Sequence, residues 1–288
     1  MSTVKTYLSL VKFSHTIFAM PFAAIGLTLG FKSAYFDADA WLILKVVLCM
    51  IFARSAAMAF NRYIDRHFDA MNARTAIREI PAGIIQPKSA LGFVILNSVL
   101  FIGTTFLINP LCFFLSPVAL LVILGYSYTK RFTAWCHLVL GLGLSLAPIG
   151  AYLAVTGRFD VLPLAYSLLV LTWVSGFDII YALQDEHFDR SVSLHSIPVS
   201  FGTSQALLIS TILHIISISI VFAIPFIDAV TVWYWCGAVL FSGLLIYQHL
   251  LVKPNDLSKV NLAFATTNGF GSLIFGIFTV VDILVTKV

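Results

Sequence analysis

Long apolar stretches separated by short polar segments run along the whole chain. A helix needs about 20 apolar residues to cross the hydrocarbon core of a bilayer. Stretches of that length cover residues 13–31, 40–62, 87–108, 110–129, 134–155, 162–184, 203–225, 229–251 and 262–285. The runs are continuous, whereas the strands of a membrane β-barrel alternate apolar and polar residues. The pattern therefore predicts an all-α, polytopic transmembrane bundle of about nine helices.

The composition agrees with a lipid environment. Of the 288 residues, 60% are hydrophobic and only 10% are charged, and the mean hydropathy is +0.98. A water-soluble domain needs more charge on its surface. The 4 cysteines stand singly, which indicates neither a disulfide framework nor a zinc site.

Basic residues are distributed unequally between the two sides of the predicted bundle. If the N-terminus is cytoplasmic, the loops at 63–86, 130–133, 185–202 and 252–261 lie on the same side as residues 1–12. That side holds Lys5, Lys12, Arg62, Arg66, Arg74, Arg78, Lys88, Lys130, Arg131, Arg190, Lys253 and Lys259, and the opposite side holds Lys32, Lys45, Arg158 and Lys287. By the positive-inside rule the richer side is cytoplasmic. We therefore expect a multi-pass protein of the bacterial inner (plasma) membrane, and the net charge of +4 gives no reason to expect a nucleic-acid partner.

One short acidic segment occurs twice. Asp65-Arg66-His67-Phe68-Asp69 recurs 120 residues later as Asp185-Glu186-His187-Phe188-Asp189. Four predicted spans separate the copies, so both have the same orientation and reach the same membrane face. The echo predicts a single domain, residues 1–288, built of two pseudo-repeated halves at about 1–132 and 133–288.

Each copy belongs to a longer motif at the end of a predicted helix. The motifs read Asn61-x-x-x-Asp65-x-x-x-Asp69 and Asp178-x-x-Tyr181-x-x-x-Asp185-x-x-x-Asp189. Spacings of three and four put the named side chains on one helical face. Oxygen ligands without cysteine or paired histidine favour Mg²⁺, which binds through carboxylates, waters and phosphates. The motifs therefore indicate a diphosphate that Mg²⁺ bridges to both clusters.

Other interpretations of the charged residues remain open at this point. The motif acids could be solvated loop residues paired with neighbouring arginines. Asp178 and Arg54 lie inside predicted spans, where they could form a buried ion pair with another helix or line a polar cavity. The basic residues near the motifs suit phosphate oxygens but could instead be topology determinants; they are Arg74, Arg78, Lys130 and Arg131.

The motifs and their surroundings resemble those of the UbiA-type intramembrane aromatic prenyltransferases. The likeness includes Arg54, the run Asn72-x-Arg74-Thr75-x-x-Arg78 and the run Tyr126-x-Tyr128-Thr129-Lys130-Arg131, and it spans essentially the whole chain. The resemblance implies a helical bundle with a central, laterally open cavity capped by two cytoplasmic loops. It also implies Mg²⁺ as cofactor and transfer of a polyprenyl group from a polyprenyl diphosphate to an aromatic acceptor by electrophilic substitution, in ubiquinone or menaquinone biosynthesis.

The resemblance also implies residue roles. The metal positions are Asn61, Asp65, Asp69, Asp185 and Asp189; the diphosphate contacts are Lys130, Arg131, Arg78 and, from its place in the basic cluster, Arg74; and the catalytic set comprises Asp65, Asp69, Asp178, Asp185, Asp189 and Tyr181. Candidate acceptor contacts are Lys12, His15 and Arg54. Relatives that use 4-hydroxybenzoate commonly have an early arginine where this chain reads Lys12-Phe13-Ser14-His15, so 1,4-dihydroxy-6-naphthoate stays a second candidate acceptor.

A secondary transporter is the alternative from another functional class. It could also place carboxylates at matched positions of two repeats, as proton or cation sites. Such sites lie near the bilayer midplane, whereas the motif acids other than Asp178 are predicted at or beyond the helix ends. This placement favours the enzyme.

Overall fold

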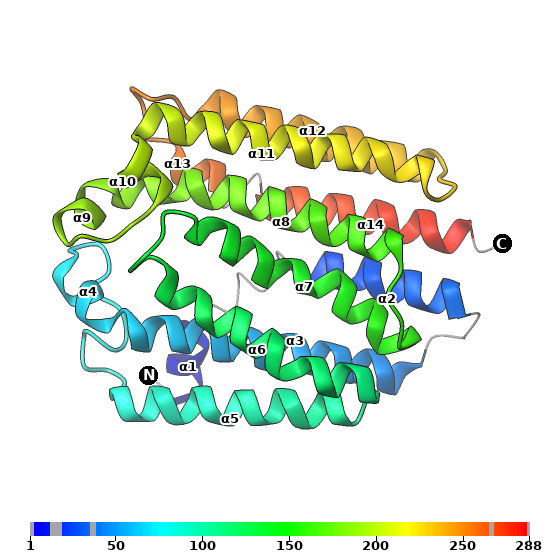
Figure 1. The fold of residues 1–288 in the computed structure, drawn as a ribbon, viewed down its shortest axis with the longest axis horizontal. Helices are drawn as coiled ribbons and strands as arrows, with labels where there is room; N and C mark the ends of the chain where they lie inside the picture. The colour runs from blue at the N-terminus through cyan, green and yellow to red at the C-terminus, as the bar shows by residue number, and fades with distance from the viewer. Residues whose placement is uncertain (1–2, 12–18, 35–38, 265–267, 287–288) are drawn as a thin grey trace.

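The computed structural model describes residues 3–11, 19–34, 39–264 and 268–286, and these residues form an all-α bundle (Figure 1). The helices are α1 (Thr3–Leu10), α2 (Met20–Ala34), α3 (Ala40–Ile64), α4 (Arg66–Met71), α5 (Pro87–Phe106), α6 (Pro110–Thr129), α7 (Cys136–Thr156), α8 (Val161–Ala182), α9 (Glu186–Ser191), α10 (Ile197–Phe201), α11 (Thr203–Ala223), α12 (Val232–Leu251), α13 (Val260–Leu262) and α14 (Asn268–Val285). Two 3₁₀ turns, Leu183–Asp185 and Ile224–Phe226, extend α8 and α11.

Within the described residues, 8 helices are long and apolar enough to cross a membrane. They are α3, α5, α6, α7, α8, α11, α12 and α14, which occupy eight of the predicted stretches. The stretch predicted at 13–31 corresponds to α2, which has 15 residues, and residues 12–18 before it lie outside the described part. The protein is an integral multi-pass membrane protein, and the predicted helical bundle is confirmed.

Local sequence signals set several helix ends. Pro87 and Pro110 occupy first-turn positions of α5 and α6, where a missing N–H costs no hydrogen bond. The Asn109 side chain accepts from the Cys112 N–H at 2.9 Å and so caps α6. Gly157 ends α7 in the left-handed conformation, at φ 64°.

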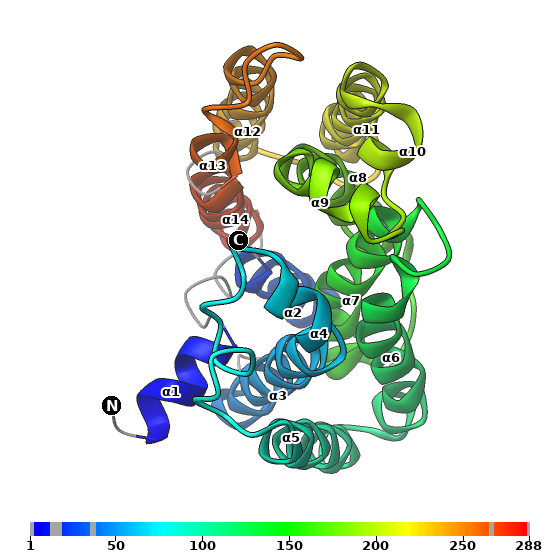
Figure 2. The same ribbon diagram turned by 90° about the vertical axis from the view of Figure 1, so that its left-hand side faces the viewer.

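Two groups of helices meet along α7 and α8. Figure 2 looks along the helices and shows α3, α5, α6 and α7 on one side and α8, α11, α12 and α14 on the other, while α2 packs against both α7 and α14. Close approach depends on glycine: a Cβ at Gly26 would collide with the Pro148 carbonyl, and one at Gly141 would collide with Ser175. Small residues allow this backbone proximity in membrane helices.

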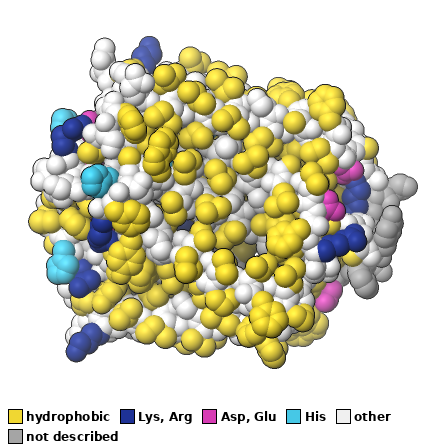
Figure 3. Space-filling model, in the orientation of Figure 1, with side chains coloured by type: hydrophobic (Ala, Val, Ile, Leu, Met, Phe, Trp, Pro, Cys, Tyr) yellow, Lys and Arg dark blue, Asp and Glu magenta, His cyan; other side chains and the backbone are white. Residues whose placement is uncertain are grey.

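The surface reflects the surrounding lipid. Hydrophobic side chains cover the middle of the molecule in Figure 3, and most Lys, Arg and His side chains lie at the end that carries α4 and α9. The aromatic core is buried where α2, α7, α8, α12 and α14 meet, and it includes Trp173, Tyr152 and Phe275.

The two motifs have the same local structure at that charged end. α3 ends before Asp65 and the six-residue α4 follows, while α8 ends before the Leu183–Asp185 turn and the six-residue α9 follows. In each case a long helix therefore gives way to a short one at the motif's acids. The two-halves interpretation of residues 1–132 and 133–288 stays a prediction.

Candidate active site

Four acids of the two motifs form four separate ion pairs at one end of the bundle. The pairs are Asp65–Arg131 at 3.0 Å, Asp69–Arg78 at 2.6 Å, Asp185–Arg74 at 2.5 Å and Asp189–Lys130 at 3.2 Å. All eight of these residues were predicted from the sequence. The alternative of solvated loop acids paired with the arginines next to them is not what the structure shows, because the four acids pair with Arg74, Arg78, Lys130 and Arg131.

Three of these pairs join segments that are distant in the chain. Arg74, in the loop after α4, reaches Asp185 at the end of α8. Lys130 and Arg131 directly follow α6, and they reach the second and first motif respectively. Arg131 also donates to the Ile64 carbonyl at 3.1 Å, which fixes it to the end of α3. The cluster therefore ties both loops and the α6 end together.

The oxygens of this cluster suit a hard divalent cation. Asp69 is buried, and its Oδ2 accepts no hydrogen bond from any described residue. Asn61 donates through Nδ2 to Asp65 at 3.0 Å, which leaves its amide oxygen as a potential ligand. No three His, Cys, Asp or Glu side chains of the described chain converge as a ready-made metal cage. Mg²⁺ needs no such cage, because it usually binds one or two carboxylates together with phosphate and water. The residues present fit this mode.

Burial and neighbouring charge set the ionisation of the cluster. Burial raises the pKa of Asp65 to about 6, even though Arg131 and Lys130 act in the opposite direction. For Lys130 burial by itself lowers the pKa, but the attraction of Asp189 outweighs it, so the net pKa lies above the usual value. Lys130 therefore keeps its positive charge beside the motif acids.

Asp178 lies deeper, seven residues before Asp185 and thus roughly 10 Å further along the helix. Its Oδ2 is 2.7 Å from Nδ1 of His137, which is fully buried on α7. Asp178 thus has a partner on another helix, as one of its two interpretations expects, and because 22% of its side chain stays exposed, its role at the substrate cavity stays a prediction. His137 was not among the residues predicted from the sequence. An ionisable residue inside an apolar stretch, as His137 is, could have indicated a functional position.

Tyr181 lies between Asp178 and Asp185 in the chain and contacts one of the ion pairs. Its hydroxyl accepts from Arg74 at 3.5 Å, and its ring packs against Phe264 with centroids 4.2 Å apart. Tyr181 is therefore held between the loop after α4 and the segment before α14.

Arg54 has no ion-pair partner in the described part of the chain. Its Nε is buried and donates no hydrogen bond to any described residue. The ion pair considered for Arg54 is thus not found there, and the side chain instead lines a cavity together with Tyr126. The other two acceptor candidates, Lys12 and His15, lie outside the described residues.

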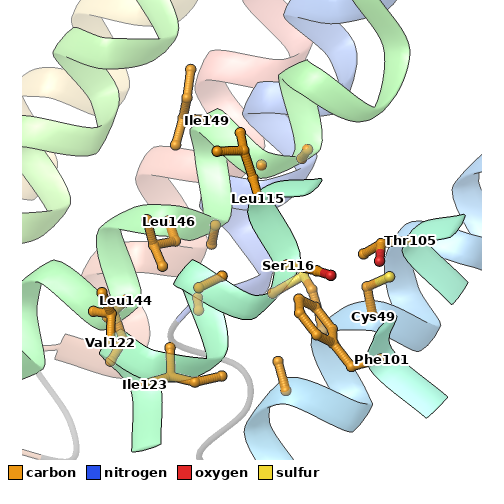
Figure 4. A pocket seen from close by; sticks show the side chains of 18 of the residues that line it. Cys49, Phe101, Thr105, Leu115, Ser116, Val122, Ile123, Leu144, Leu146 and Ile149 are labelled. Atoms are coloured by element: carbon orange, nitrogen blue, oxygen red, sulfur yellow. The ribbon is translucent and has the colours of Figure 1, made fainter. Parts of the chain in front are cut away.

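The cavity has a volume of about 390 Å³ and is bounded by α3, α5, α6 and α7. Figure 4 shows part of its wall, where side chains such as Leu115, Ile123 and Leu146 surround the space. Along α3 the lining extends from Met58 to Val46, which is roughly 18 Å at about 1.5 Å per residue. The cavity is therefore long and apolar, and Arg54 is the only Lys, Arg, Asp or Glu among its described lining residues.

Comparison with known proteins identifies the family. Residues 19–274 match the model of the UbiA prenyltransferase family. The chain belongs to this family. A protein named 4-hydroxybenzoate octaprenyltransferase from Tolumonas auensis is 32% identical over 222 residues, which cover 77% of each chain. A protein of the same name from Aliivibrio salmonicida is 32% identical over 241 residues, which cover 82% of each chain.

Solved structures of UbiA homologs share the fold. The apo structure of a UbiA homolog from Aeropyrum pernix K1 has a TM-score of 0.81 at 26% identity, covering 96% of this chain and 98% of that one. A UbiA homolog from Archaeoglobus fulgidus, described as bound to DMAPP and Mg²⁺, has a TM-score of 0.70 at 19% identity, covering 94% and 99%.

The family membership settles the class of activity. This UbiA-family chain is a prenyltransferase, as the motifs predicted, and the transporter alternative is set aside.

Proposed function

We propose that this prenyltransferase transfers a polyprenyl group from a polyprenyl diphosphate to an aromatic acid, either 4-hydroxybenzoate or 1,4-dihydroxy-6-naphthoate, for ubiquinone or menaquinone biosynthesis. The observation that carries the proposal is that α3 and α6, which line the long apolar cavity as far as Met58 and Tyr126, lead on to the fourfold acid–base cluster at their ends. A diphosphate and a hydrocarbon chain need these two environments. The names of the relatives, 4-hydroxybenzoate octaprenyltransferases, agree with this chemistry.

The ion pairs suit an exchange of partners on binding. The four carboxylates can pass to Mg²⁺, while the four basic side chains pass to diphosphate oxygens. Because cations and anions are exchanged together, no charge in the cluster is left without a partner. The structures of the Archaeoglobus fulgidus homolog bound to DMAPP and Mg²⁺ and to GPP and Mg²⁺ support this assignment, because that homolog has a similar fold.

The residues then divide the chemistry by position. Mg²⁺, when bound, would neutralise the charge that develops on the departing diphosphate. Lys130, Arg131, Arg78 and Arg74 would stabilise the same charge from the protein side. The donor's C–O bond breaks, and the allylic cation is left at the cavity end, near the aromatic ring of Tyr126.

The acceptor would lie between Arg54 and Asp178. Arg54 and Tyr126 line the cavity, and Asp178 is one of the charged groups near Tyr126. An acid substrate would give the unpaired Arg54 guanidinium a carboxylate partner. A ring carbon then bonds to the allylic carbon, and the ring proton leaves to Asp178, which restores aromaticity.

We further infer that the cluster faces the cytoplasm of a bacterial inner membrane. The support is the basic residues of the loops around α4 and α9, because such loops stay cytoplasmic under the positive-inside rule.

Prenyl transfer by purified protein in lipid tests the proposal. Geranyl diphosphate and a longer polyprenyl diphosphate are offered with each acceptor, with Mg²⁺ or with EDTA, and products are identified by mass spectrometry. We expect a C-prenylated aromatic acid with one acceptor, only when Mg²⁺ is present. Failure to form product with either acid and either donor would refute the assigned substrate class, and product formation in EDTA would refute the assigned cofactor.

A further inference from the structure

His137 is buried at the start of α7, and both of its ring nitrogens are engaged. Nδ1 lies 2.7 Å from Oδ2 of Asp178, and Nε2 accepts from the Ile197 N–H at 3.4 Å. The His137 side chain has no exposed surface. Its carbonyl also accepts from the Ser175 hydroxyl at 3.1 Å, so the residue is held from three sides.

These contacts suit one protonation state of the ring. Nε2 must present a lone pair to the Ile197 N–H, so the single proton of a neutral imidazole resides on Nδ1. That proton is donated to Asp178, whose carboxylate accepts it. A doubly protonated ring would direct an Nε2–H at the Ile197 N–H, which the geometry disfavours.

We propose that His137 is the positioning residue of Asp178: neutral, with its proton on Nδ1, it holds one carboxylate oxygen so that the other faces the acceptor. Asp178 suits this arrangement because 22% of its side chain is exposed, although its Oδ2 is engaged by a fully buried ring. The inference rests on the acceptor position proposed above. It adds a residue that belongs to neither aspartate motif.

The segment that contacts His137 also contacts the predicted diphosphate side of the site. Ile197 begins α10, and two residues earlier the His195 N–H donates to the Lys130 carbonyl at 2.7 Å. Lys130 pairs with Asp189. The segment from His195 to Ile197 therefore contacts both His137 and Lys130, which fixes the position of one relative to the other.

Two amide substitutions separate the two ring contacts. In His137→Asn the side-chain NH₂ lies near the position of Nδ1 and can still donate to Asp178. In His137→Gln the amide extends to the position of Nε2 and cannot make that bond. We expect His137→Gln to lower kcat by about 10- to 100-fold, with the KM of the prenyl diphosphate unchanged. We expect His137→Asn to stay within a few-fold of the wild-type kcat.

A double-mutant cycle tests whether His137 acts through Asp178. In an Asp178→Asn background His137→Gln should cause no further loss of kcat, because the group that it positions is already changed. A merely structural role would give losses that multiply. The inference is overturned if His137→Gln is as active as the wild type, if His137→Asn is as slow as His137→Gln, or if the losses multiply.

Nitrogen-15 NMR of histidine-labelled protein tests the hydrogen bond without turnover. The resonances that disappear in His137→Asn should show a protonated Nδ1 and an unprotonated Nε2, and Asp178→Asn should shift the Nδ1 signal. An imidazolium, or a proton on Nε2, would overturn the inference even in active protein. If the wild type forms no product with either acceptor, the substrate proposal fails, while this spectrum still decides the role of His137.

Discussion

The neighbours Asp185 and Glu186 provide a matched test of the metal–diphosphate site. Both are acids paired with an arginine: Asp185 contacts Arg74, and Glu186 contacts Arg190 at 3.1 Å. Only Asp185 belongs to the cluster of four ion pairs. Asp185→Asn and Glu186→Gln each remove one negative charge from adjacent positions while keeping the side-chain size.

We expect Asp185→Asn to lower kcat/KM for prenyl transfer at least about 100-fold, a loss of about 2.7 kcal/mol of transition-state stabilisation, because it removes a ligand of the ion that balances the leaving group. Glu186→Gln should stay within about twofold, since an exposed pair four residues apart on a helix contributes only about 0.3–0.5 kcal/mol.

Stability separates a functional loss from misfolding. The Arg74 side chain is 38% exposed and that of Asp185 13%, so solvent screens their ion pair and its loss should cost less than about 1 kcal/mol of unfolding free energy. Both variants should therefore unfold at nearly the wild-type temperature in the same detergent. Activity is read from released diphosphate and from the prenylated product. Equal activities of the two variants, or near-wild-type turnover by Asp185→Asn, would refute the assignment of Asp185.

Three further outcomes follow from the cluster and the cavity. Burial raises the pKa of Asp65 to about 6, so protons compete with Mg²⁺ for this carboxylate below pH 6. The Mg²⁺ concentration that gives the half-maximal rate should therefore rise about tenfold per pH unit below pH 6 and stay constant above pH 7. A concentration that does not change from pH 5 to 8 would contradict this. Gly150 lines the cavity, and a side chain there would enter open space. Gly150→Phe should therefore fill part of the cavity and lower kcat/KM at least about tenfold for octaprenyl diphosphate but not for the shorter geranyl diphosphate. The control Gly103→Phe, which lies outside the lining, should change kcat/KM for neither donor. Arg54→Ala should raise the acceptor KM about 10- to 100-fold with the donor KM unchanged, and equal rises in both constants would argue against a carboxylate contact.

Much of the fold could be predicted from the sequence because a bilayer imposes a length on each helix. Runs such as 110–129 matched α6 to the residue, since apolar content alone decides where a span can lie. The shared face of the two motifs was also predictable, because an even number of spans preserves orientation. The short helix α4 could not be predicted from an apolar run, because it is only six residues long and contains two charged residues, Arg66 and Asp69.

The pairing inside the site could not be predicted in the same way. Arg131 and Asp65 are 66 residues apart, and their contact depends on how α6 and α3 pack against each other. Periodicity places a side chain on a face of its own helix but does not choose the neighbouring helix. His137 was missed for this reason, since its partner Asp178 is on α8 while its local sequence is apolar. The sequence left two alternatives open for Asp178, and its contact with His137 could be seen only in the tertiary structure.

The charged groups of the site differ in depth along the bundle and in whether they have a partner of opposite charge. The fourfold cluster lies beyond or at the ends of α3 and α8, where ions are least costly, and each member already has a partner. Arg54 is deeper and has no acidic partner among the described residues, and an unpaired charge at that depth is strongly disfavoured. A substrate that brings a carboxylate to Arg54 therefore gains more there than it would at the exposed end. The same arrangement disfavours an uncharged aromatic acceptor, because such a molecule would occupy the space and leave the guanidinium unsatisfied. The proposed selection for an aromatic acid thus rests on one unpaired arginine and the apolar wall around it.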